Sequence, residues 1–85
     1  MGRRHEPQPA VGRAIRQLRN ERGLKQIELA RAADVNKTEM SNLERGLLNP
    51  AWGTIKRVAK ALDVEVSEVA ALAERIERDH EFDSD

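Results

Sequence analysis

The sequence predicts an all-α domain built from five helices. Apolar residues recur at spacings of three and four in separate stretches, which is the period of helices that bury one face. Short segments containing Gly, Asp, Asn or Pro divide these stretches, and such residues end helices or form turns. No stretch carries the signals of a strand. Short connections between helices around one core are typical of all-α domains.

Length and composition limit the chain to one small aliphatic core. Its 85 residues make a single domain near the lower end of what one core stabilises. One Trp, one Phe and no Tyr argue against an aromatic ligand cage and against base stacking on single strands. The absence of Cys excludes disulfides and thiolate metal sites, and suits a reducing cytoplasm.

The sequence gives no indication of a membrane span, a metal site or an active site. No apolar run approaches the length of a span, and MGRR at the start is followed by no signal-type segment. His5 and His80 lie in opposite polar ends without ligand spacing. The sequence shows no nucleophile, acid–base pair or metal ligands arranged as in an active site, and so short a chain offers little volume for a substrate pocket. We therefore expect a cytoplasmic protein that is no enzyme and has no metal, cofactor or small-molecule ligand.

Charge is unevenly divided along a chain whose formal net charge is zero. Residues 1–62 carry thirteen basic and six acidic side chains, whereas residues 63–85 carry two basic and nine acidic ones. The body therefore has a charge of +7 and the C-terminal segment a charge of −7. Such asymmetry points to contact between nucleic acid and the basic part. Mixed charges also solvate the surfaces of many ordinary proteins, so charge alone does not establish that the chain binds nucleic acid.

The first helix is expected from Pro9 to about Arg22, after a flexible basic arm of residues 1–8. Pro9 suits the first turn, where its missing N–H has no partner to lose. Gly23 supplies a left-handed stop, after which Leu24 can fold back onto the helix end. The apolar residues of this helix share one face: Val11, Ile15 and Leu18.

The next stretch has the spacing of a helix-turn-helix. A second helix opens at Gln26, and its period breaks at Asp34, where a left-handed backbone is expected. Asn36 caps a third helix, with Glu39 three residues later in a capping-box pattern, and Gly46 ends it. Two short helices joined by such a turn present the second helix to the major groove of DNA. The apolar positions are Leu29, Ala30, Ala33, Val35, Met40 and Leu43.

Two further helices complete the domain, which we place at residues 9–78. A rigid connection over residues 47–50 leads to a fourth helix at about 51–62, and a short turn leads to a fifth from about Val66. The residues expected to be buried are Trp52, Ile55, Val58, Ala59 and Leu62 in the fourth helix, and Val69, Leu72 or Ala73, and Ile76 in the fifth. Residues 79–85 are expected to be an acidic disordered tail.

Four segments give the chain a family resemblance: IRQLRNERGLKQIELA from Ile15, the turn and third helix through NLERG, NPAWGTIKRVAKAL from Asn49, and DVEVSEV from Asp63. In this order and spacing the chain resembles the Xre family of helix-turn-helix regulators, the group of the lambdoid phage repressors and Cro proteins. The resemblance covers about residues 11–69. It implies a five-helix, lambda-repressor-like DNA-binding domain whose third helix enters the major groove.

The resemblance implies base contacts from Lys37, Thr38 and Asn42, with Ser41 a lesser candidate. Their chemistry agrees, since Lys donates to guanine, Asn pairs with adenine, and Thr offers a hydroxyl or a methyl group. Merely solvated side chains on a surface helix would look the same. Glu39 could accept from cytosine, but its place after the cap favours a capping role.

The resemblance also implies contacts that position the protein on DNA. Gln26 matches a phosphate contact at a helix start, and Arg45 matches one at the far end of the third helix. Arg19 and Glu44 match an ion pair that in some relatives links the first helix to the third. A partly buried pair would hold the recognition helix at its angle, whereas an exposed one would contribute little. We favour the linking role.

The chain departs from the family pattern in three places. Asp34 stands where Gly is common, and Lys25 stands where Ser or Thr often caps the second helix. Leu47 and Leu48 replace a loop that is often basic in relatives. These two leucines have two competing explanations, namely burial against the fourth helix or a seam between two copies on DNA.

The sequence thus predicts a homodimeric regulator of transcription, a repressor or autoregulator, that reads a palindromic operator in double-stranded DNA. One recognition helix reads few base pairs, and a two-fold dimer doubles them. Leu72 and Ile76 offer a second possible seam, and Arg3 and Arg4 in the arm could reach the duplex or simply be disordered. The alternative is a helix-turn-helix module for protein interaction, antitoxin-like or bridging, which the leucine pair and the acidic end favour.

Overall fold

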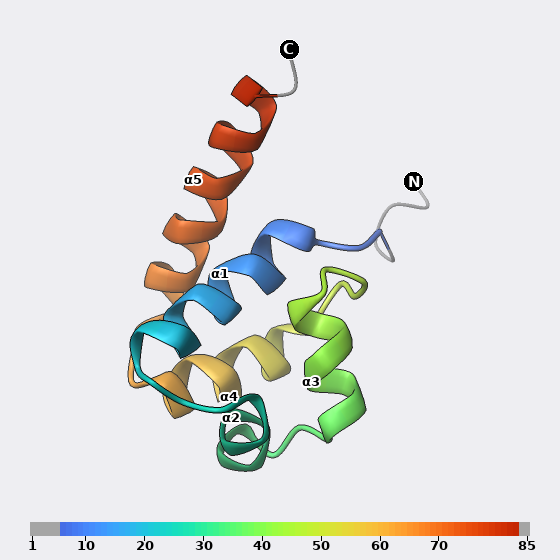
Figure 1. Ribbon diagram of the computed structural model, residues 1–85, viewed down its shortest axis with the longest axis vertical. Coiled ribbons are helices and arrows are strands. Elements are labelled where there is room, and N and C mark those ends of the chain that lie inside the picture. Colours follow the sequence, from blue (N-terminus) through green and yellow to red (C-terminus); the bar gives the residue numbers. More distant parts are fainter. Residues whose placement is uncertain (1–5, 84–85) are drawn as a thin grey trace.

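Five helices and no strand form the part of the chain that the computed structural model describes, residues 6–83, with side chains described for residues 6–79. This confirms the all-α class and the five-helix order (Figure 1). The helices are α1 (Pro9–Glu21), α2 (Gln26–Ala33), α3 (Lys37–Glu44), α4 (Trp52–Leu62) and α5 (Val66–Asp83). Among the described residues, no helix combines the length and the apolar character needed to cross a bilayer.

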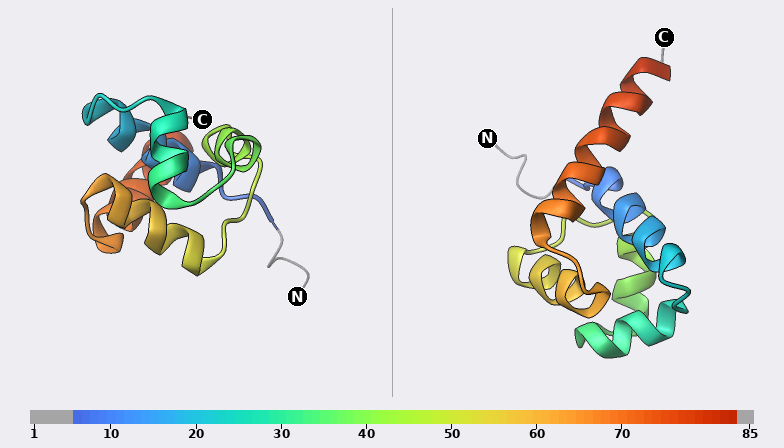
Figure 2. Two further views of the ribbon diagram at one scale, coloured as in Figure 1. Left: turned by 90° about the horizontal axis from the view of Figure 1, so that it is seen from below. Right: turned by 90° about the vertical axis from the view of Figure 1, so that its left-hand side faces the viewer.

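α1 lies at the centre of the bundle, between α5 and α3 (Figures 1 and 2). α2 packs against both α4 and α3. Since α3 also packs against α1, it is held by α1 and by α2. The core between the helices is aliphatic and rich in alanine, which allows short helices to approach closely. Its buried members are Ala10, Ala14, Ile15, Leu29, Ala30, Ala33, Val35, Met40, Leu43, Val58, Ala59, Leu62, Val69 and Ala73.

Residues with a left-handed backbone close four helix ends. They are Gly23, Asp34, Gly46 and Asp63, with φ values of 69, 57, 81 and 59°. After each, the next residue donates its N–H to a carbonyl five residues earlier, at 2.9–3.1 Å, which is the bond of a Schellman cap. The expected left-handed positions at Gly23 and Asp34 are confirmed. A local backbone signal therefore sets where the helices of the helix-turn-helix begin and end.

Trp52 does not lie in the core, so the prediction of its burial is wrong. Its exposed fraction is 62%, whereas Val58, Ala59 and Leu62 on the same helix are buried and Ile55 is half-buried. Trp52 is the first residue of α4. Thr54 in the same turn is buried, so the first turn of α4 is covered on the side of Thr54 and not on the side of Trp52.

α5 runs to Asp83 and is therefore longer than predicted. A disordered tail was expected from residue 79. No Gly or Pro interrupts it after Ile76, and Glu74 and Arg78 have the i,i+4 spacing that supports a helix. α5 projects beyond α1 and away from α2 (Figures 1 and 2). The C-terminal acidic residues of the helix are therefore carried away from the helix-turn-helix.

Candidate nucleic-acid interface

α3 has one buried and one polar side. Met40 and Leu43 are almost completely buried on the inward side. The structure brings the four predicted base-reading residues to the other side, since their positions recur at helical spacing. Two are exposed and two are half-buried: Lys37 and Thr38, then Ser41 and Asn42. This surface offers an ammonium, two hydroxyls and an amide to a groove.

The start of α3 is capped as the sequence predicts. The Glu39 N–H donates to Asn36 Oδ1 at 2.7 Å. Within the described residues the reciprocal bond, from the Asn36 N–H to the Glu39 carboxylate, is not formed, so only half of the capping box is present. The Glu39 carboxylate lies in the first turn, where negative charge is favourable.

A buried carboxylate, that of Glu44, joins three helices. Arg19 Nε lies 2.7 Å from Glu44 Oε2, and Arg19 Nη2 donates to Glu44 Oε1 at 3.0 Å, a bidentate pair. The side chains of Arg19 and Glu44 are only 12% and 2% exposed. Arg19 Nη1 also donates to the carbonyl of Leu24 at 2.8 Å, where the turn before α2 begins. The ion pair is therefore of the partly buried kind that can fix the angle of α3.

Gln26 is the second partner of this carboxylate. Its Nε2 donates to Glu44 Oε1 at 3.0 Å, so the side chain expected at a phosphate is engaged within the protein. The N–H groups in the first turn of a helix have no intrahelical acceptor, and the start of α2 therefore keeps backbone donors for an anion. We refer to Arg19, Gln26 and Glu44 together as the Glu44 cluster.

Arg45 lies at the far end of α3 and is exposed. Its Nη1 donates to Asn42 Oδ1 across a long 3.5 Å hydrogen bond, so the predicted phosphate contact and the predicted adenine contact are neighbours. A guanidinium has five N–H donors, and one weak internal bond leaves others for a phosphate.

Gly12 allows α1 to lie very close to α3, a role that the sequence did not reveal. A Cβ at this position would lie 2.0 Å from the carbonyl oxygen of Leu43, so no other residue fits without displacing a helix. Nearby, a Cβ on Gly46 would lie 2.9 Å from the Cβ of Pro9. A glycine inside a helix lowers stability by about 1 kcal/mol relative to alanine. The presence of glycine inside the predicted first helix was therefore a sequence signal that something packs closely there.

Arg57 of α4 was also missed. Its Nε donates to the carbonyl oxygen of Ala33, the last residue of α2, at 3.0 Å. A cation at a helix C-terminus is favourable because the carbonyls there have no intrahelical partner. Arg57 therefore ties the first helix of the helix-turn-helix to α4.

The structure separates the two leucines of the loop after α3. Leu48 is half-buried and packs against the core, and its carbonyl accepts the Gln8 N–H at 2.9 Å. Leu47 is 51% exposed. Burial thus explains Leu48 but not Leu47. Leu72 and Ile76, the second possible seam, are partly buried against the core.

A tight turn between α2 and α3, with the polar side of α3 exposed, defines the class of helix-turn-helix proteins to which DNA-binding transcriptional regulators belong. The model of the helix-turn-helix domain family matches residues 10–72. The chain belongs to this family. The resemblance to Xre-type regulators is thereby confirmed, together with the lambda-repressor-like fold.

Several of the relatives are regulators by name. The chain is 37% identical to the immunity repressor protein of Bacillus phage phi105, over 69% of this chain and 41% of that protein. It is 36% identical to the HTH-type transcriptional regulator SinR of Bacillus licheniformis, over 88% of this chain and 68% of that protein. The chain therefore spans less than half of the phage repressor's length and about two thirds of SinR.

Solved structures agree with this relationship. The restriction-modification controller protein C.AhdI from Aeromonas hydrophila matches with a TM-score of 0.70 and 33% identity, covering 72% of this chain and 92% of that chain. SinR in complex with DNA matches with a TM-score of 0.67 and 38% identity, covering 71% of this chain and 97% of that chain.

Proposed function

We propose that the chain acts as a homodimer that binds a palindromic operator in double-stranded DNA and represses transcription, with α3 in the major groove. One observation carries the proposal: α3 exposes a polar side while its opposite side is locked to α1 and α2 by the Glu44 cluster and the Gly12 contact. A recognition helix reads bases only when its angle to the rest of the protein is fixed.

Each group of side chains has a role in this proposal. Lys37, Thr38, Ser41 and Asn42 read base edges, whereas Arg45 and the start of α2 bind phosphates and set the register. Arg3 and Arg4 lie outside the described residues.

The relatives support regulation by repression, because their names include an immunity repressor protein and a competence pilus inhibition repressor. Two copies are needed because one recognition helix discriminates few base pairs, at roughly 1–3 kcal/mol for each good contact. Half-sites of the operator should lie about one helical turn apart, as the two-fold symmetry of a dimer requires. Such a protein acts where the genome is, in the cytoplasm.

Asn42→Ala and Arg45→Ala separate the two kinds of contact. We expect Asn42→Ala to lose roughly 1–3 kcal/mol of binding at one base position and to relax the preference there. Arg45→Ala should weaken binding to all sequences alike and reduce the salt dependence by about one charge. Titration of both variants against the operator and its single-base variants measures these effects.

Arg75→Ala is the matched control for the loss of an arginine. Arg75 is exposed on α5, beside Gln17 and Leu72 and away from α3. Its removal should leave the affinity and base preferences unchanged. If Asn42→Ala weakens binding to all sequences equally, α3 does not read bases through Asn42.

A second candidate function is protein interaction, and the exposure of Leu47 and Trp52 favours it. Large apolar side chains that stay exposed, as these two do among the described residues, are typical of contact surfaces. In that case, the helix-turn-helix would act as an adaptor, and duplex DNA would not be selected by sequence.

A further inference from the structure

The two ends of α3 are held in different ways. Its last residue is Glu44, so the Glu44 cluster fixes the far end of the helix to α1 and α2. At the other end, residues 34–36 alone connect α2 to α3. A helix has a defined angle to the rest of a protein only when both of its ends are held. The angle of α3 therefore depends on how firmly this short turn is fixed.

Arg57 reaches the turn from α4, a helix outside the helix-turn-helix. Its Nε donates to the carbonyl oxygen of Ala33 at 3.0 Å, and Ala33 is the buried last residue of α2. The carbonyls in the last turn of a helix have no intrahelical donor. A side chain of α4 therefore supplies a bond to the end of α2 that α2 cannot make for itself.

This bond acts on the least favourable backbone conformation of the helix-turn-helix. Asp34, the residue after Ala33, is left-handed, with a φ of 57°. Residues other than glycine seldom adopt this conformation, and it persists where the surrounding structure holds it. The carbonyl that accepts from Arg57 belongs to the peptide group between Ala33 and Asp34. Arg57 therefore holds the backbone directly before the left-handed residue.

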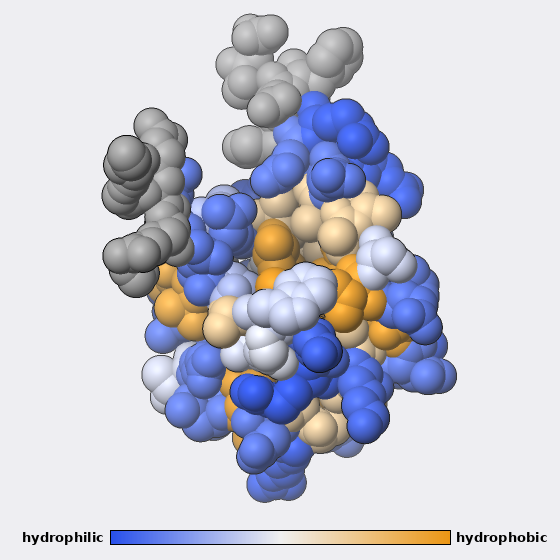
Figure 3. All heavy atoms as spheres, turned by 180° about the vertical axis from the view of Figure 1, so that it is seen from behind, coloured by the Kyte–Doolittle hydropathy of each residue, from blue (hydrophilic) through white to orange (hydrophobic). Residues whose placement is uncertain are grey.

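The bond lies where water can replace it. Arg57 is exposed, and together with Ala33 and Asp34 it lines an open pocket of about 430 Å³ between α2 and α4. α2 lies at the lower end of the molecule in Figure 1, and hydrophilic side chains predominate at that end when it is seen from behind (Figure 3). Water could therefore donate to the carbonyl if Arg57 were replaced. Loss of the bond should loosen the turn without unfolding the protein.

We propose that Arg57 is a positioning residue for DNA recognition. Its bond to the Ala33 carbonyl fixes the turn between α2 and α3, and thereby the angle at which α3 meets the groove. Arg57 acts through the turn and not by contact with DNA. The proposal rests on the proposed function, because the angle of α3 is a property that DNA binding uses.

Three replacements of Arg57 separate its hydrogen bond from its charge. The amide nitrogen of glutamine lies as many bonds from the backbone as Nε of arginine, so Arg57→Gln keeps a donor without a charge. Arg57→Met keeps neither. Arg57→Lys keeps the charge, but its nitrogen lies one bond further out. The glutamine and methionine variants therefore have the same charge and differ in the donor.

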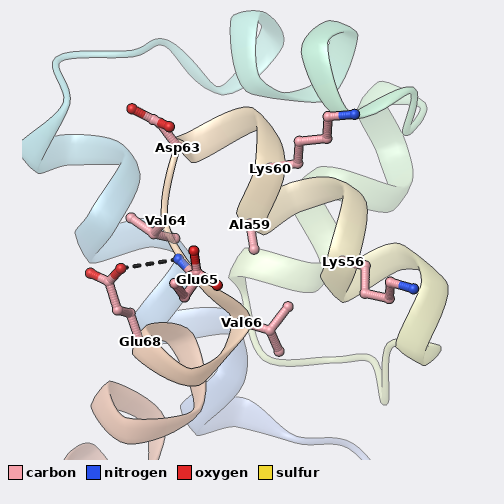
Figure 4. A pocket seen from close by; sticks show the side chains of 8 residues that line it. All are labelled: Lys56, Ala59, Lys60, Asp63, Val64, Glu65, Val66 and Glu68. Atoms are coloured by element: carbon pink, nitrogen blue, oxygen red, sulfur yellow. Dashed lines mark hydrogen bonds between the residues drawn. The ribbon is translucent and has the colours of Figure 1, made fainter.

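Lys60 provides the control for a charge near the end of α2. It follows Arg57 by three residues, is exposed and lines the same pocket as Ala33. Its side chain extends from α4 toward α2 (Figure 4). It forms no hydrogen bond or ion pair within residues 6–79. Lys60→Met therefore removes a positive charge from this place without removing a bond.

Operator affinity is measured at a temperature at which circular dichroism shows every variant to be folded. Arg57→Met should bind roughly threefold to tenfold more weakly than Arg57→Gln, the range expected for one hydrogen bond. Arg57→Lys should resemble Arg57→Met, and Lys60→Met should bind within about twofold of the wild type. A purely structural role would lower the melting temperature without this difference between folded proteins. Equal affinities of Arg57→Met and Arg57→Gln overturn the proposal, as does a loss in Lys60→Met as large as that in Arg57→Met.

Amide hydrogen exchange tests the turn without DNA. The N–H groups of Asp34 and Val35 close the turn on the carbonyls of Arg31 and Ala30. They should exchange roughly threefold to tenfold faster in Arg57→Met than in Arg57→Gln, whereas the amides of α1 should exchange equally in both. Equal exchange in the turn contradicts the role of Arg57, and so does an acceleration that is uniform over the turn and α1. A wild-type protein that selects no DNA sequence contradicts the proposed function instead, and the exchange rates then still decide whether Arg57 holds the turn.

Discussion

Gly12→Ala is expected to lower the free energy of unfolding by about 3 kcal/mol or more. The added Cβ would lie 2.0 Å from the Leu43 carbonyl oxygen, and that oxygen belongs to the backbone of α3, which cannot rotate away like a side chain. Either α1 and α3 separate or the fold is lost. Chemical denaturation of the two proteins measures the change, and DNA affinity should fall because α3 is displaced.

Gly53→Ala is the control for the same substitution in another helix. A Cβ on Gly53 meets only the end of the Arg57 side chain, at 4.0 Å. Since alanine is favoured over glycine inside a helix by roughly 0.5–1 kcal/mol, Gly53→Ala should stabilise the protein slightly. A Gly12→Ala variant as stable as the wild type would show that the contact between α1 and α3 is not close.

Arg19→Met should lower the free energy of unfolding by about 3–5 kcal/mol, because it leaves the buried Glu44 carboxylate without its cation. Gln26 alone would then donate to that carboxylate. Thermal or denaturant unfolding measures the loss. Binding to the operator should weaken further than instability alone explains, since α3 loses its link to α1.

Arg16→Met is the matched control, because Arg16 is exposed on the same helix. It should change stability by no more than about 0.5 kcal/mol. The double variant Arg19→Met with Glu44→Met should recover much of the stability, since apolar residues of similar volume often replace a buried ion pair at little cost. A small effect of Arg19→Met alone would mean that water already compensates for the pair.

The boundaries of the first three helices were predictable because their signals are local, whereas the end of α5 was not. Gly23 and Asp34 close helices through backbone conformation and a bond to a carbonyl five residues earlier, and Asn36 caps α3 with its own side chain. None of these features needs a distant partner. The same holds for the polar side of α3, which follows from helical spacing alone.

The features that the sequence did not reveal depend on distant contacts. Gly12 meets Leu43, and Gln26 meets Glu44, only after three helices have packed. Trp52 fits the spacing of the buried side of α4, but spacing does not show whether another helix covers the first turn. Arg19 and Glu44 were found only through the family resemblance, since 25 residues separate them.

The central claim is sequence-specific recognition of duplex DNA, and selection from a randomised duplex library tests it most directly. Purified protein is mixed with the library, the retained duplexes are sequenced, and the best one is titrated at several salt concentrations. We expect a palindrome with half-sites about 10–10.5 base pairs apart and an affinity that falls steeply with salt. Folded protein that enriches no sequence at low salt would contradict the claim and would favour the protein-interaction module.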